Sequence, residues 1–460
     1  MTRSLRLCPL DFSVEAEVAF KVIAADALYA FWLDSARAES SMSRFSYVGV
    51  VPDESAVVRV GHASKNNNPW RQFAEVLAQA PTVDFEGHDS SLCSYLKDEL
   101  LGGYVGYFGY ESRRSLGFAT SHRAETPDAL WMPAVRYLMI DHLMQRAYLV
   151  GDDAWLEETV PLLQEVGSVS KPLDSELPYG LDFKTPERAD YVAAIENSLH
   201  EIFEGNSYEV CLTAETRASL PPEINNPQGI FNLYRAQRRH NPAPYAAFLR
   251  CKDHWVLSSS PERYLSISAG GYAEAKPIKG TVERSADPLE DLRNATWLHD
   301  DPKTRAENLM IVDLMRNDLS QVSQPGSVKV PVLMGVESYA TVHQLVSTIA
   351  AQLRSDVSAV DAAAACFPGG SMTGAPKPST MAIIDRLENR ARGIYSGALG
   401  FFSASGAAQL SIVIRTLVVL PDGEVSLSAG GAIVADSNPD AEYEEMLAKL
   451  RAAVPGESIF

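Results

Sequence analysis

The chain has little cysteine and no long run of apolar residues. Its 460 residues include only five cysteines, which are scattered and show no CxxC spacing: Cys8, Cys93, Cys211, Cys251 and Cys366. A disulfide framework or a zinc site is therefore not expected, and a reducing cytoplasm is favoured. No segment reaches the roughly eighteen apolar residues of a membrane span, and the N-terminus lacks the apolar stretch of a signal peptide. We expect a soluble cytoplasmic protein with no membrane partner.

Positive charge is also scarce. The sequence has 40 Lys and Arg against 59 Asp and Glu, which gives a formal net charge of −19 at pH 7. This charge argues against nucleic acid as a partner, because phosphate binding needs surplus Lys and Arg. An anionic small molecule would have to be held by local positive charge or by a metal ion, since the overall field repels it.

The chain is long enough for two or three domains or for one large two-lobed fold, and its composition is that of a globular protein, 46% apolar and 22% charged. Residues 167–180 are rich in turn-forming residues and mark a boundary. We therefore predict an N-terminal domain at 1–166, a linker at 167–184 and a second domain at 185–460.

Three helices and several strands are expected in the second domain. The first helix is capped by Thr185 and stopped by Gly205, and it carries an apolar stripe that includes Phe203. The second helix starts at Asp301-Pro302 with an almost wholly apolar core, and the last spans about 439–452. Strands rich in β-branched residues are expected at 255–268, 394–403, 409–420 and 424–435, the last two joined by a turn that ends at Gly423. Long strands adjacent in sequence favour an α/β or α+β fold with much antiparallel sheet.

The segment 275–284, Ala-Lys-Pro-Ile-Lys-Gly-Thr-Val-Glu-Arg, is the strongest candidate for a site. Lys279 follows a Pro-Ile that restricts the backbone, and Gly280-Thr281 behind it allows close approach by a substrate. Such a lysine is either a nucleophile or an anion clamp. Taken alone, a solvated surface lysine is the commoner interpretation.

The last helix carries Glu442, Glu445 and Lys449 on one face, because they are spaced i, i+3 and i+7. Two carboxylates and an ammonium on one stripe can hold a divalent cation beside a substrate carboxylate. The alternative is an ordinary helix surface, in which acids favour the N-terminus and Glu445 pairs with Lys449.

The second helix carries Glu307 immediately before its apolar core. A carboxylate on a buried helix needs a cation or a basic side chain. Mg²⁺ held by one or two carboxylates, waters and substrate would satisfy it. A salt bridge to Lys303 or Arg305 is the competing explanation.

Three further features carry candidate site residues. The segment 368–377, with Thr373, lacks the Gly-Lys-Ser/Thr end of a phosphate loop, so we do not expect it to bind ATP. Its glycine-rich turn exposes backbone amides that could still bind a carboxylate. His343 is a lone histidine among apolar residues, which is more often a satisfied core side chain than a catalyst. Arg415 ends an apolar strand, where an arginine is costly unless it meets an anion.

Seven motifs in order resemble the chorismate-utilising enzyme family, which includes anthranilate, aminodeoxychorismate, isochorismate and salicylate synthases. The resemblance covers about residues 190–450 and rests on 260–263, 277–281, 306–318, 343–347, 368–377, 392–397 and 436–449. Residues 43–47 and 103–107 resemble the N-terminal companion domain of the first two members. The family fold is a layered sandwich of two large, mostly antiparallel sheets covered by helices, with its site in a cleft between two lobes.

The branch of the family is indicated by two positions. Members that add water to chorismate carry a lysine base where this chain has Glu209, which argues against them. Anthranilate synthases resemble Pro-Ile-Ala-Gly-Thr at 277–281, whereas the aminodeoxychorismate synthase component I branch resembles Pro-Ile-Lys-Gly-Thr, as found here. Two alternatives stay open: an anthranilate synthase large subunit and a non-catalytic chorismate-binding subunit.

The resemblance implies amination of chorismate at C4, the first step toward 4-aminobenzoate and folate, and a role for each site residue. Lys279 is the nucleophile at C2, provided that its pKa falls, and Glu262 is the general acid and base. Mg²⁺ lies on Glu307 and Glu445, with Glu442 as a further ligand. His343 and Thr373 are two further catalytic residues, which contact the ring or the leaving group. Contacts to chorismate come from Tyr395, Arg415, Gly430, Gly431, Lys449, Gly280 and Thr281.

Two more expectations follow from the same resemblance. No cysteine has the Gly-x-Cys-x-Gly setting of a glutaminase nucleophile, so ammonia comes from a glutamine amidotransferase subunit or from solution. The N-terminal motif and the segment 241–245 resemble the pocket in which some relatives hold tryptophan. That pocket would be formed by Ser35, Ser43, Arg44, Phe45, Pro242 and Tyr245.

Overall fold

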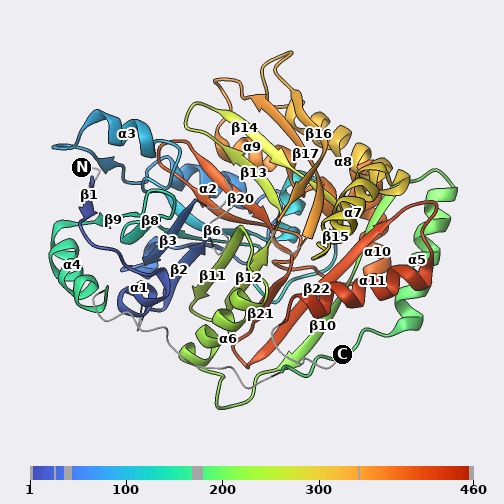
Figure 1. Ribbon diagram of the computed structural model, residues 1–460, viewed down its shortest axis with the longest axis horizontal. Helices are drawn as coiled ribbons and strands as arrows, with labels where there is room; N and C mark the ends of the chain where they lie inside the picture. Colours follow the sequence, from blue (N-terminus) through green and yellow to red (C-terminus); the bar gives the residue numbers. More distant parts are fainter. Residues whose placement is uncertain (1–3, 25–26, 36–43, 168–179, 340–341, 455–460) are drawn as a thin grey trace.

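Two large β-sheets make up the centre of the computed structural model, which describes residues 4–24, 27–35, 44–167, 180–339 and 342–454 (Figure 1). Their strand pairs are antiparallel, apart from one short parallel pair between β1 (Leu5–Leu10) and β5 (Val83–Asp84). The sheets stack face to face, and helices cover their outer faces (Figure 1). The expected layered α/β sandwich of antiparallel sheets is confirmed.

The first sheet has 12 strands among the described residues. In spatial order they are β18 (Gly374–Ala375), β10 (Glu209–Ser219), β22 (Glu424–Ile433), β21 (Thr416–Val419), β12 (Trp255–Ser260), β11 (Tyr245–Cys251), β2 (Tyr29–Asp34), β3 (Phe45–Val50), β8 (Tyr137–Asp141), β9 (Arg146–Gly151), β1 and β5.

The second sheet has 10 strands among the described residues, nine of them in one continuous order. That order is β15 (Ile278–Glu283), β17 (Val342–Gln352), β14 (Tyr272–Lys276), β13 (Arg263–Ile267), β20 (Ala408–Ile412), β19 (Ala398–Phe402), β6 (Tyr104–Phe108), β7 (Ala129–Pro133) and β4 (Val58–Val60), with β16 (Lys329–Ser338) paired to β17.

The helices divide between the two outer faces. Those packed on the first sheet are α1 (Ala16–Ile23), α4 (Asp153–Gly167), α5 (Arg188–Phe203), α6 (Pro227–His240), α10 (Lys377–Glu388) and α11 (Pro439–Ala452). Those packed on the second are α2 (Pro69–Leu77), α7 (Pro288–Asp300), α8 (Pro302–Ser320) and α9 (Ala359–Cys366). Helix α3 (Ser90–Leu96) places Leu96 at the core between the sheets.

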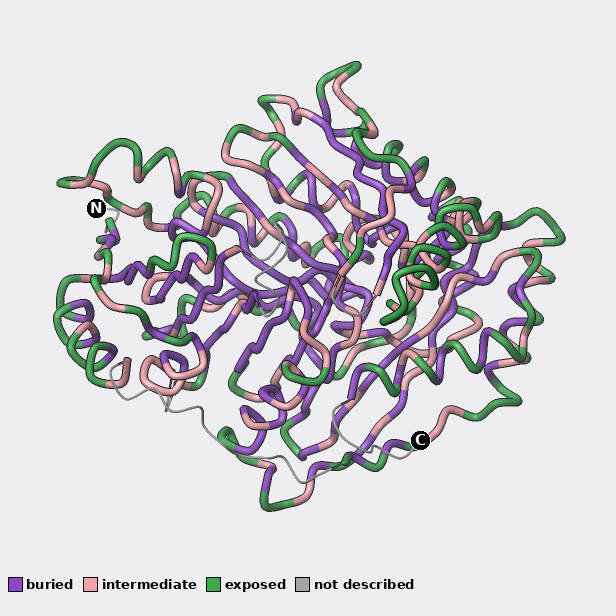
Figure 2. The backbone as a smooth tube through the Cα atoms, viewed as in Figure 1, coloured by how far each residue is buried: buried purple, intermediate pink, exposed green. Residues whose placement is uncertain are grey.

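The hydrophobic core lies in three layers. The middle layer, between the sheets, includes Phe31 of β2, Tyr107 of β6 and Phe401 of β19. The other two layers lie between each sheet and its helices. Figure 2 shows the consequence, since buried residues follow the strands through the centre and exposed residues follow the outer turns of the helices. Alternation along each strand serves a core on both faces of each sheet.

Both sheets run across the domain boundary predicted at 167–184. Strand β11 pairs with β2 in the first sheet, and β19 pairs with β6 in the second, so residues before and after the boundary share each sheet. Residues 168–179 of the predicted linker lie outside the described residues. The division into domains at 1–166 and 185–460 stays a prediction.

The expected helix ends are partly right. Helices α8 and α11 begin as predicted, because Asp301 and Asn438 accept hydrogen bonds from backbone N–H groups of the first turn and a proline follows each of them. The first helix begins later than the sequence predicts. It begins at Arg188. The Lys184 backbone N–H donates to the Arg217 carbonyl of β10, which holds the segment before the helix against that strand.

Two assumptions about burial were wrong. Helix α8 is not apolar on all sides, since Leu309 is 53% exposed and the helix buries one face on β17 and α9. Phe203, a member of the apolar stripe of the first helix, is the last residue of α5 and is 88% exposed.

Two of the predicted strands are interrupted at residues of the predicted site. The predicted strand 255–268 is interrupted between β12 and β13, where Glu262 lies. The predicted strand 409–420 is interrupted between β20 and β21, where Arg415 has a positive φ of 50°. Predicted strand 394–403 begins only at Ala398, because the Gly397 N–H closes a turn on the Ile394 carbonyl. Strand 424–435 and its Gly423 turn are confirmed.

Candidate active site

A cavity of about 690 Å³ lies between the two halves of the sandwich, bounded by β10 and β22 with α11 on one side and by β15, α7 and α8 on the other. Its size is within the usual range of ligand sites, roughly 300–1,000 Å³. Twelve of the predicted site residues line it: Glu262, Lys279, Gly280, Thr281, Glu307, Tyr395, Arg415, Gly430, Gly431, Glu442, Glu445 and Lys449. The fold therefore gathers residues from distant segments around one space.

Lys279 reaches the cavity from β15 and is paired with a buried carboxylate. Its Nζ donates a hydrogen bond of 2.8 Å to Oε1 of Glu209, at the start of β10. Burial by itself lowers the pKa of Lys279, but the negative charges of Glu209 and Glu307 outweigh burial and hold that pKa above its usual value. The condition for nucleophilic attack, a lowered pKa, is therefore not met in the free site, because the nearest charges are carboxylates.

Glu262 lies on the loop between β12 and β13, and its side chain is buried. Burial raises its pKa to about 7, and the Ser371 hydroxyl, which donates a 2.7 Å hydrogen bond to Oε1, and the charge of Lys279 oppose that rise. A carboxyl group that titrates near neutrality can both give and accept a proton. These properties are the ones that a general acid and base requires.

Glu307 and Glu442 face each other across an ammonium group. Lys303 Nζ lies 3.1 Å from Oε1 of Glu442 and 3.9 Å from Oε1 of Glu307. Burial raises the pKa of Glu307 to about 7, with Lys279 opposing it. Part of the competing explanation from the sequence, a salt bridge between Glu307 and Lys303, is thus present in the structure.

Glu445 and Lys449 form the i,i+4 ion pair that the sequence allows, 2.7 Å from Oε1 to Nζ, yet both also line the cavity. Burial raises the pKa of Glu445, and Lys449 more than reverses the effect, so that the pKa lies below its usual value. Lys449 also donates to the Gly430 carbonyl at 2.9 Å. A Cβ at Gly431 would lie 3.2 Å from Glu442 Oε2, so glycine keeps this wall open.

The three carboxylates suit magnesium by their chemistry. Glu307, Glu442 and Glu445 offer the hard oxygen donors that Mg²⁺ prefers, and Mg²⁺ needs only one or two protein carboxylates when water and substrate complete its shell. Among the described residues, no group of three or more acidic, histidine or cysteine side chains is close enough to hold a metal by itself. The residues fit an open magnesium site, with Lys303 and Lys449 as the cations that now balance their charge.

Backbone conformation shapes the wall around Lys279. Gly280 has a φ of 83°, and a Cβ there would approach Thr304 Cγ2 to 2.4 Å, so glycine is required where β15 passes α8. Tyr395 and Arg415 also line the cavity. Burial holds the pKa of Tyr395 above its usual range, which keeps the phenol a hydrogen-bond donor.

Two predicted catalytic residues do not line the cavity. His343 is bonded to Ser338 and, through Nε2 at 2.9 Å, to Asp291 of α7, whereas its neighbour Gln344 lines the cavity, because side chains alternate along β17. Thr373 is fully buried, and its hydroxyl donates to the Gly369 carbonyl at 3.2 Å. The catalytic roles assigned to these two residues stay predictions without support from the geometry.

Sequence reasoning missed three side chains of the site. Ser371 falls within the segment 368–377 without a role of its own, Lys303 is expected only as a salt-bridge partner, and Glu209 only marks the absence of a lysine. Each acts on a residue far away in the chain. Only a pattern of buried polar side chains in otherwise apolar surroundings, such as Glu209 before Val210-Cys211-Leu212, could have drawn attention to them.

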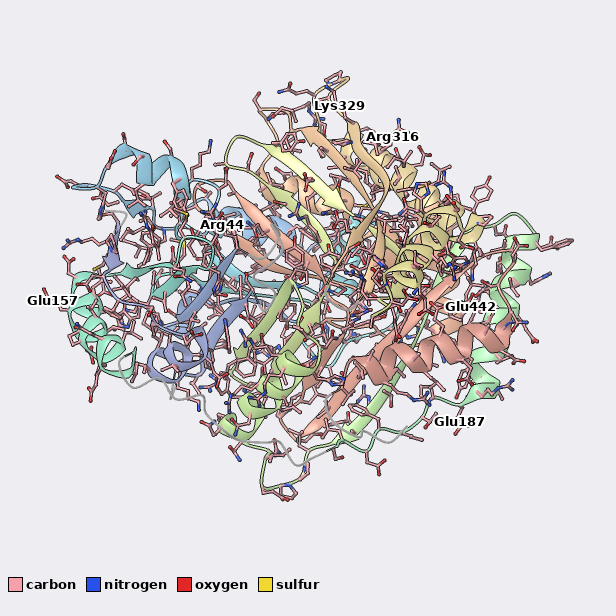
Figure 3. The ribbon with its side chains drawn as sticks, viewed as in Figure 1. Arg44, Glu157, Glu187, Arg316, Lys329 and Glu442 are labelled. Atoms are coloured by element: carbon pink, nitrogen blue, oxygen red, sulfur yellow. The ribbon has the colours of Figure 1, made fainter. Side chains whose placement is uncertain are left out.

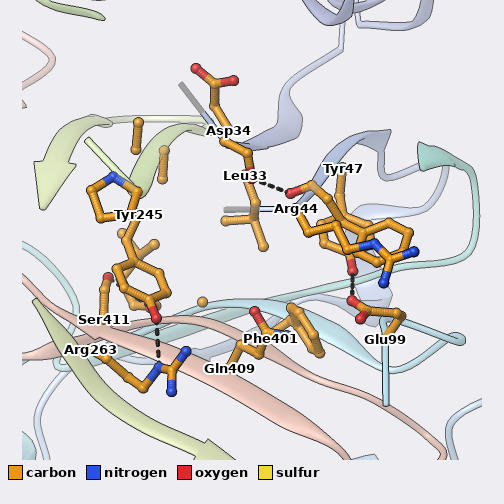
Figure 4. A pocket seen from close by; sticks show the side chains of 17 residues that line it. Leu33, Asp34, Arg44, Tyr47, Glu99, Tyr245, Arg263, Phe401, Gln409 and Ser411 are labelled. Carbon is orange, nitrogen blue, oxygen red and sulfur yellow. Dashed lines mark hydrogen bonds between the residues drawn. The ribbon is translucent and has the colours of Figure 1, made fainter. Parts of the chain in front are cut away.

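A second cavity of about 250 Å³ lies between β2, β3, β11 and β19 (Figure 4). Four predicted tryptophan-pocket residues line it, Ser35, Arg44, Phe45 and Tyr245, whereas Pro242 does not and Ser43 lies outside the described residues. Arg44 and Glu442 mark the two cavities in Figure 3, well apart across the sandwich. Occupation by tryptophan stays a prediction.

The chain belongs to the family of chorismate binding enzymes, whose model matches residues 29–455. It is 42% identical to an aminodeoxychorismate synthase of Streptomyces pristinaespiralis, over 96% of this chain and 63% of that protein. It is 39% identical to aminodeoxychorismate synthase component 1 of Klebsiella aerogenes, over 76% of each chain. The chain spans less than two thirds of the Streptomyces relative's length.

A solved structure shares the fold. The crystal structure of anthranilate synthase component I from Streptococcus pneumoniae matches with a TM-score of 0.73 and 28% identity, over 90% of this chain and 93% of that one. Among the described residues, no helix is long and apolar enough to cross a membrane.

Proposed function

We propose that the chain converts chorismate and ammonia to 4-amino-4-deoxychorismate. The observation that carries this proposal is a lysine, Lys279, in a cavity that also holds an acid titrating near neutrality, Glu262. The similarity to aminodeoxychorismate synthases supports the same assignment. Because the chain spans less than two thirds of the first relative's length, the activity, substrates and partners of the whole protein are part of the proposal.

The stereochemistry of the reaction explains why a nucleophile is needed. Direct displacement of the C4 hydroxyl by ammonia would invert that carbon. Attack by Lys279 at C2, with loss of the C4 hydroxyl, followed by attack of ammonia at C4, with loss of Lys279, gives net retention. Glu262 protonates the departing hydroxyl and then accepts a proton from the incoming amine.

Binding is assigned to the other residues of the cavity. Arg415 and Tyr395 contact the pyruvyl carboxylate, and Lys449 and the backbone at Gly430 lie beside the ring carboxylate. Glu307 and Glu445, with Glu442, would hold Mg²⁺, which supplies positive charge for the ring carboxylate when bound. This local charge offsets the repulsion that a chain of net charge −19 exerts on an anion.

Ammonia is assigned to a separate glutamine amidotransferase subunit. The "component 1" in the name of the Klebsiella relative indicates that such a protein works with a second component. A cytoplasmic location is proposed together with this partner.

Product analysis separates the proposal from its nearest alternative, an anthranilate synthase. Chorismate, magnesium and an ammonium salt are incubated with the protein, and the products are separated by chromatography. We expect 4-amino-4-deoxychorismate without release of pyruvate. Fluorescent anthranilate with an equal amount of pyruvate would instead make the chain an anthranilate synthase. Chorismate binding without turnover would make it a non-catalytic subunit.

Magnesium binding has its own prediction. Glu307→Gln is expected to weaken Mg²⁺ affinity at least about tenfold, because a carboxylate ligand and its charge are lost. Affinity in the wild type should rise with pH through about 7, where Glu307 ionises. Calorimetric titration with Mg²⁺ alone measures both. Glu337→Gln, which removes a carboxylate paired with Lys276 outside the cavity, is the control. Equal affinity in both variants would remove Glu307 from the metal site.

A further inference from the structure

Behind the proposed nucleophile lies a carboxylate that the reaction has not used. Glu209 is 0% exposed and does not itself line the cavity. Its Oε1 accepts the hydrogen bond from Lys279 Nζ at 2.8 Å, and its Oε2 has no hydrogen-bond partner among the described residues. A buried carboxylate with one oxygen unsatisfied costs stability, since its desolvation is only partly repaid. Such a residue is better explained by the reaction than by the fold.

The reaction requires a neutral amine, and the free site holds an ammonium. The charged or titratable groups around Lys279 come from four elements: Glu209 and Cys211 from β10, Glu262 from the loop after β12, Glu307 from α8 and Glu445 from α11. These carboxylates keep the pKa of Lys279 above its usual value, against the effect of burial. A proton must therefore leave Nζ before attack.

The geometry selects the acceptor of that proton. Glu262 has to be in its acid form to protonate the departing hydroxyl, and it already accepts a hydrogen bond from Ser371. Glu307 lies beside Lys303. Of the three carboxylates Glu209, Glu262 and Glu307, Glu209 is the one that accepts a hydrogen bond from Nζ.

We propose that Glu209 is the base that takes the proton from Lys279 as chorismate reacts, which rests on the proposed function. The proton moves from Nζ to a carboxylate oxygen of Glu209, and the freed electron pair of Nζ forms the bond to C2. The two conjugated double bonds of the ring shift by one position each, and the C4–O bond breaks. The hydroxyl leaves as water with the proton of Glu262.

The return half-reaction restores every group. Ammonia forms its bond to C4, the double bonds shift back, and the bond between C2 and Nζ breaks with its electron pair on Nζ. The amine of Lys279 takes back the proton of Glu209, and Glu262 takes one from the new C4 ammonium group. No proton is exchanged with solvent at Lys279 in either half, because its acceptor lies within the site.

Internal transfer has a measurable consequence. In the wild type, the step at Lys279 does not depend on the proton concentration in solution. In Glu209→Gln, Nζ has to lose its proton to solvent. The fraction of neutral amine, and with it the rate of attack by Lys279, should therefore rise about tenfold per pH unit until the amine is neutral. Any dependence on Glu262 is common to both proteins and cancels when the two rates are divided.

The experiment measures formation of the covalent adduct between Lys279 and chorismate by rapid quenching and intact-protein mass, with magnesium and without ammonia, from about pH 6.5 to 9. Wild type should exceed Glu209→Gln about 10²-fold near pH 7, and this ratio should fall about tenfold per pH unit. A ratio that stays constant with pH would show a merely structural role. A variant as fast as wild type at neutral pH would also overturn the proposal.

Two further variants separate the possible failures. Glu209→Asp keeps a carboxylate, so the ratio of the wild-type rate to its rate should not change with pH, even if its rate is lower. A ratio that falls about tenfold per pH unit, as expected for Glu209→Gln, would overturn the proposal. This result can be obtained even if Glu209→Gln does not fold. Glu215→Gln removes a carboxylate from the same strand, where it pairs with Arg217, and should match wild type. If wild type and Glu215→Gln form no adduct at Lys279, the proposed function has failed, whatever Glu209 does.

Discussion

Replacing Lys279 by alanine is expected to abolish product formation from chorismate and an ammonium salt, while chorismate still binds. The loss should be at least about 10³-fold in kcat, because the variant lacks the amine that forms the bond at C2. Alanine also leaves Glu209 buried without its partner, which destabilises the fold by about 3–5 kcal/mol. Turnover is therefore measured together with thermal melting and with chorismate affinity.

Lys279→Arg is expected to remove the nucleophile without destabilising the fold, which separates the two effects of the alanine variant. The guanidinium retains the ion pair with Glu209, but it stays protonated and is a poor nucleophile. It should be as inactive as alanine and melt close to wild type. Lys276→Ala is the matched control, since Lys276 pairs with Glu337 at 2.7 Å and does not line the cavity. Wild-type turnover in the arginine variant would remove Lys279 as the nucleophile.

Glu262→Gln is expected to lower the rate of adduct formation by about 10²- to 10⁴-fold, because the departing hydroxyl loses its proton donor. The pH dependence follows from the raised pKa of about 7. The acid form is present below that pKa and is lost as the pH rises through it. The wild-type rate should therefore fall about tenfold per pH unit above about pH 7, and this decline should be absent in Glu262→Gln.

Ser371→Ala is a second test of the Glu262 assignment, in which the decline in rate should shift in pH and not disappear. The Ser371 hydroxyl donates to Glu262 Oε1 and lowers the pKa of that carboxyl group, so its removal should move the decline to higher pH without abolishing activity. Saturating magnesium keeps the titration of Glu307 out of the profile. A decline that stays in place in both variants would assign it to a group other than Glu262.

The sequence predicted most of the cavity from short motifs. Lys279-Gly280-Thr281 lie together on β15, and Glu442, Glu445 and Lys449 share one face of α11, because strand and helix periodicity set the direction of neighbouring side chains. Glycine at 280 was indicated by its type alone, and its positive φ beside Thr304 gives the reason. Local geometry is enough for residues of one element.

Contacts between elements were beyond the sequence. Alternation along β17 could not say whether His343 or Gln344 faces the cavity, since that depends on which side of the strand the cavity lies. The breaks that place Glu262 and Arg415 fall inside segments that look like continuous strands. Both outcomes depend on pairing with neighbours far away in the chain.

The sequence by itself determined the family, the sandwich of antiparallel sheets and the amine and acid of the cavity, because ordered motifs of local residues carry them. Only the tertiary structure decided the charge on that amine. It brings Glu209, 70 residues before Lys279, to 2.8 Å from Nζ across β10 and β15. Electrostatic energy depends on distance in space and on burial, and the spacing of residues along the sequence gives neither.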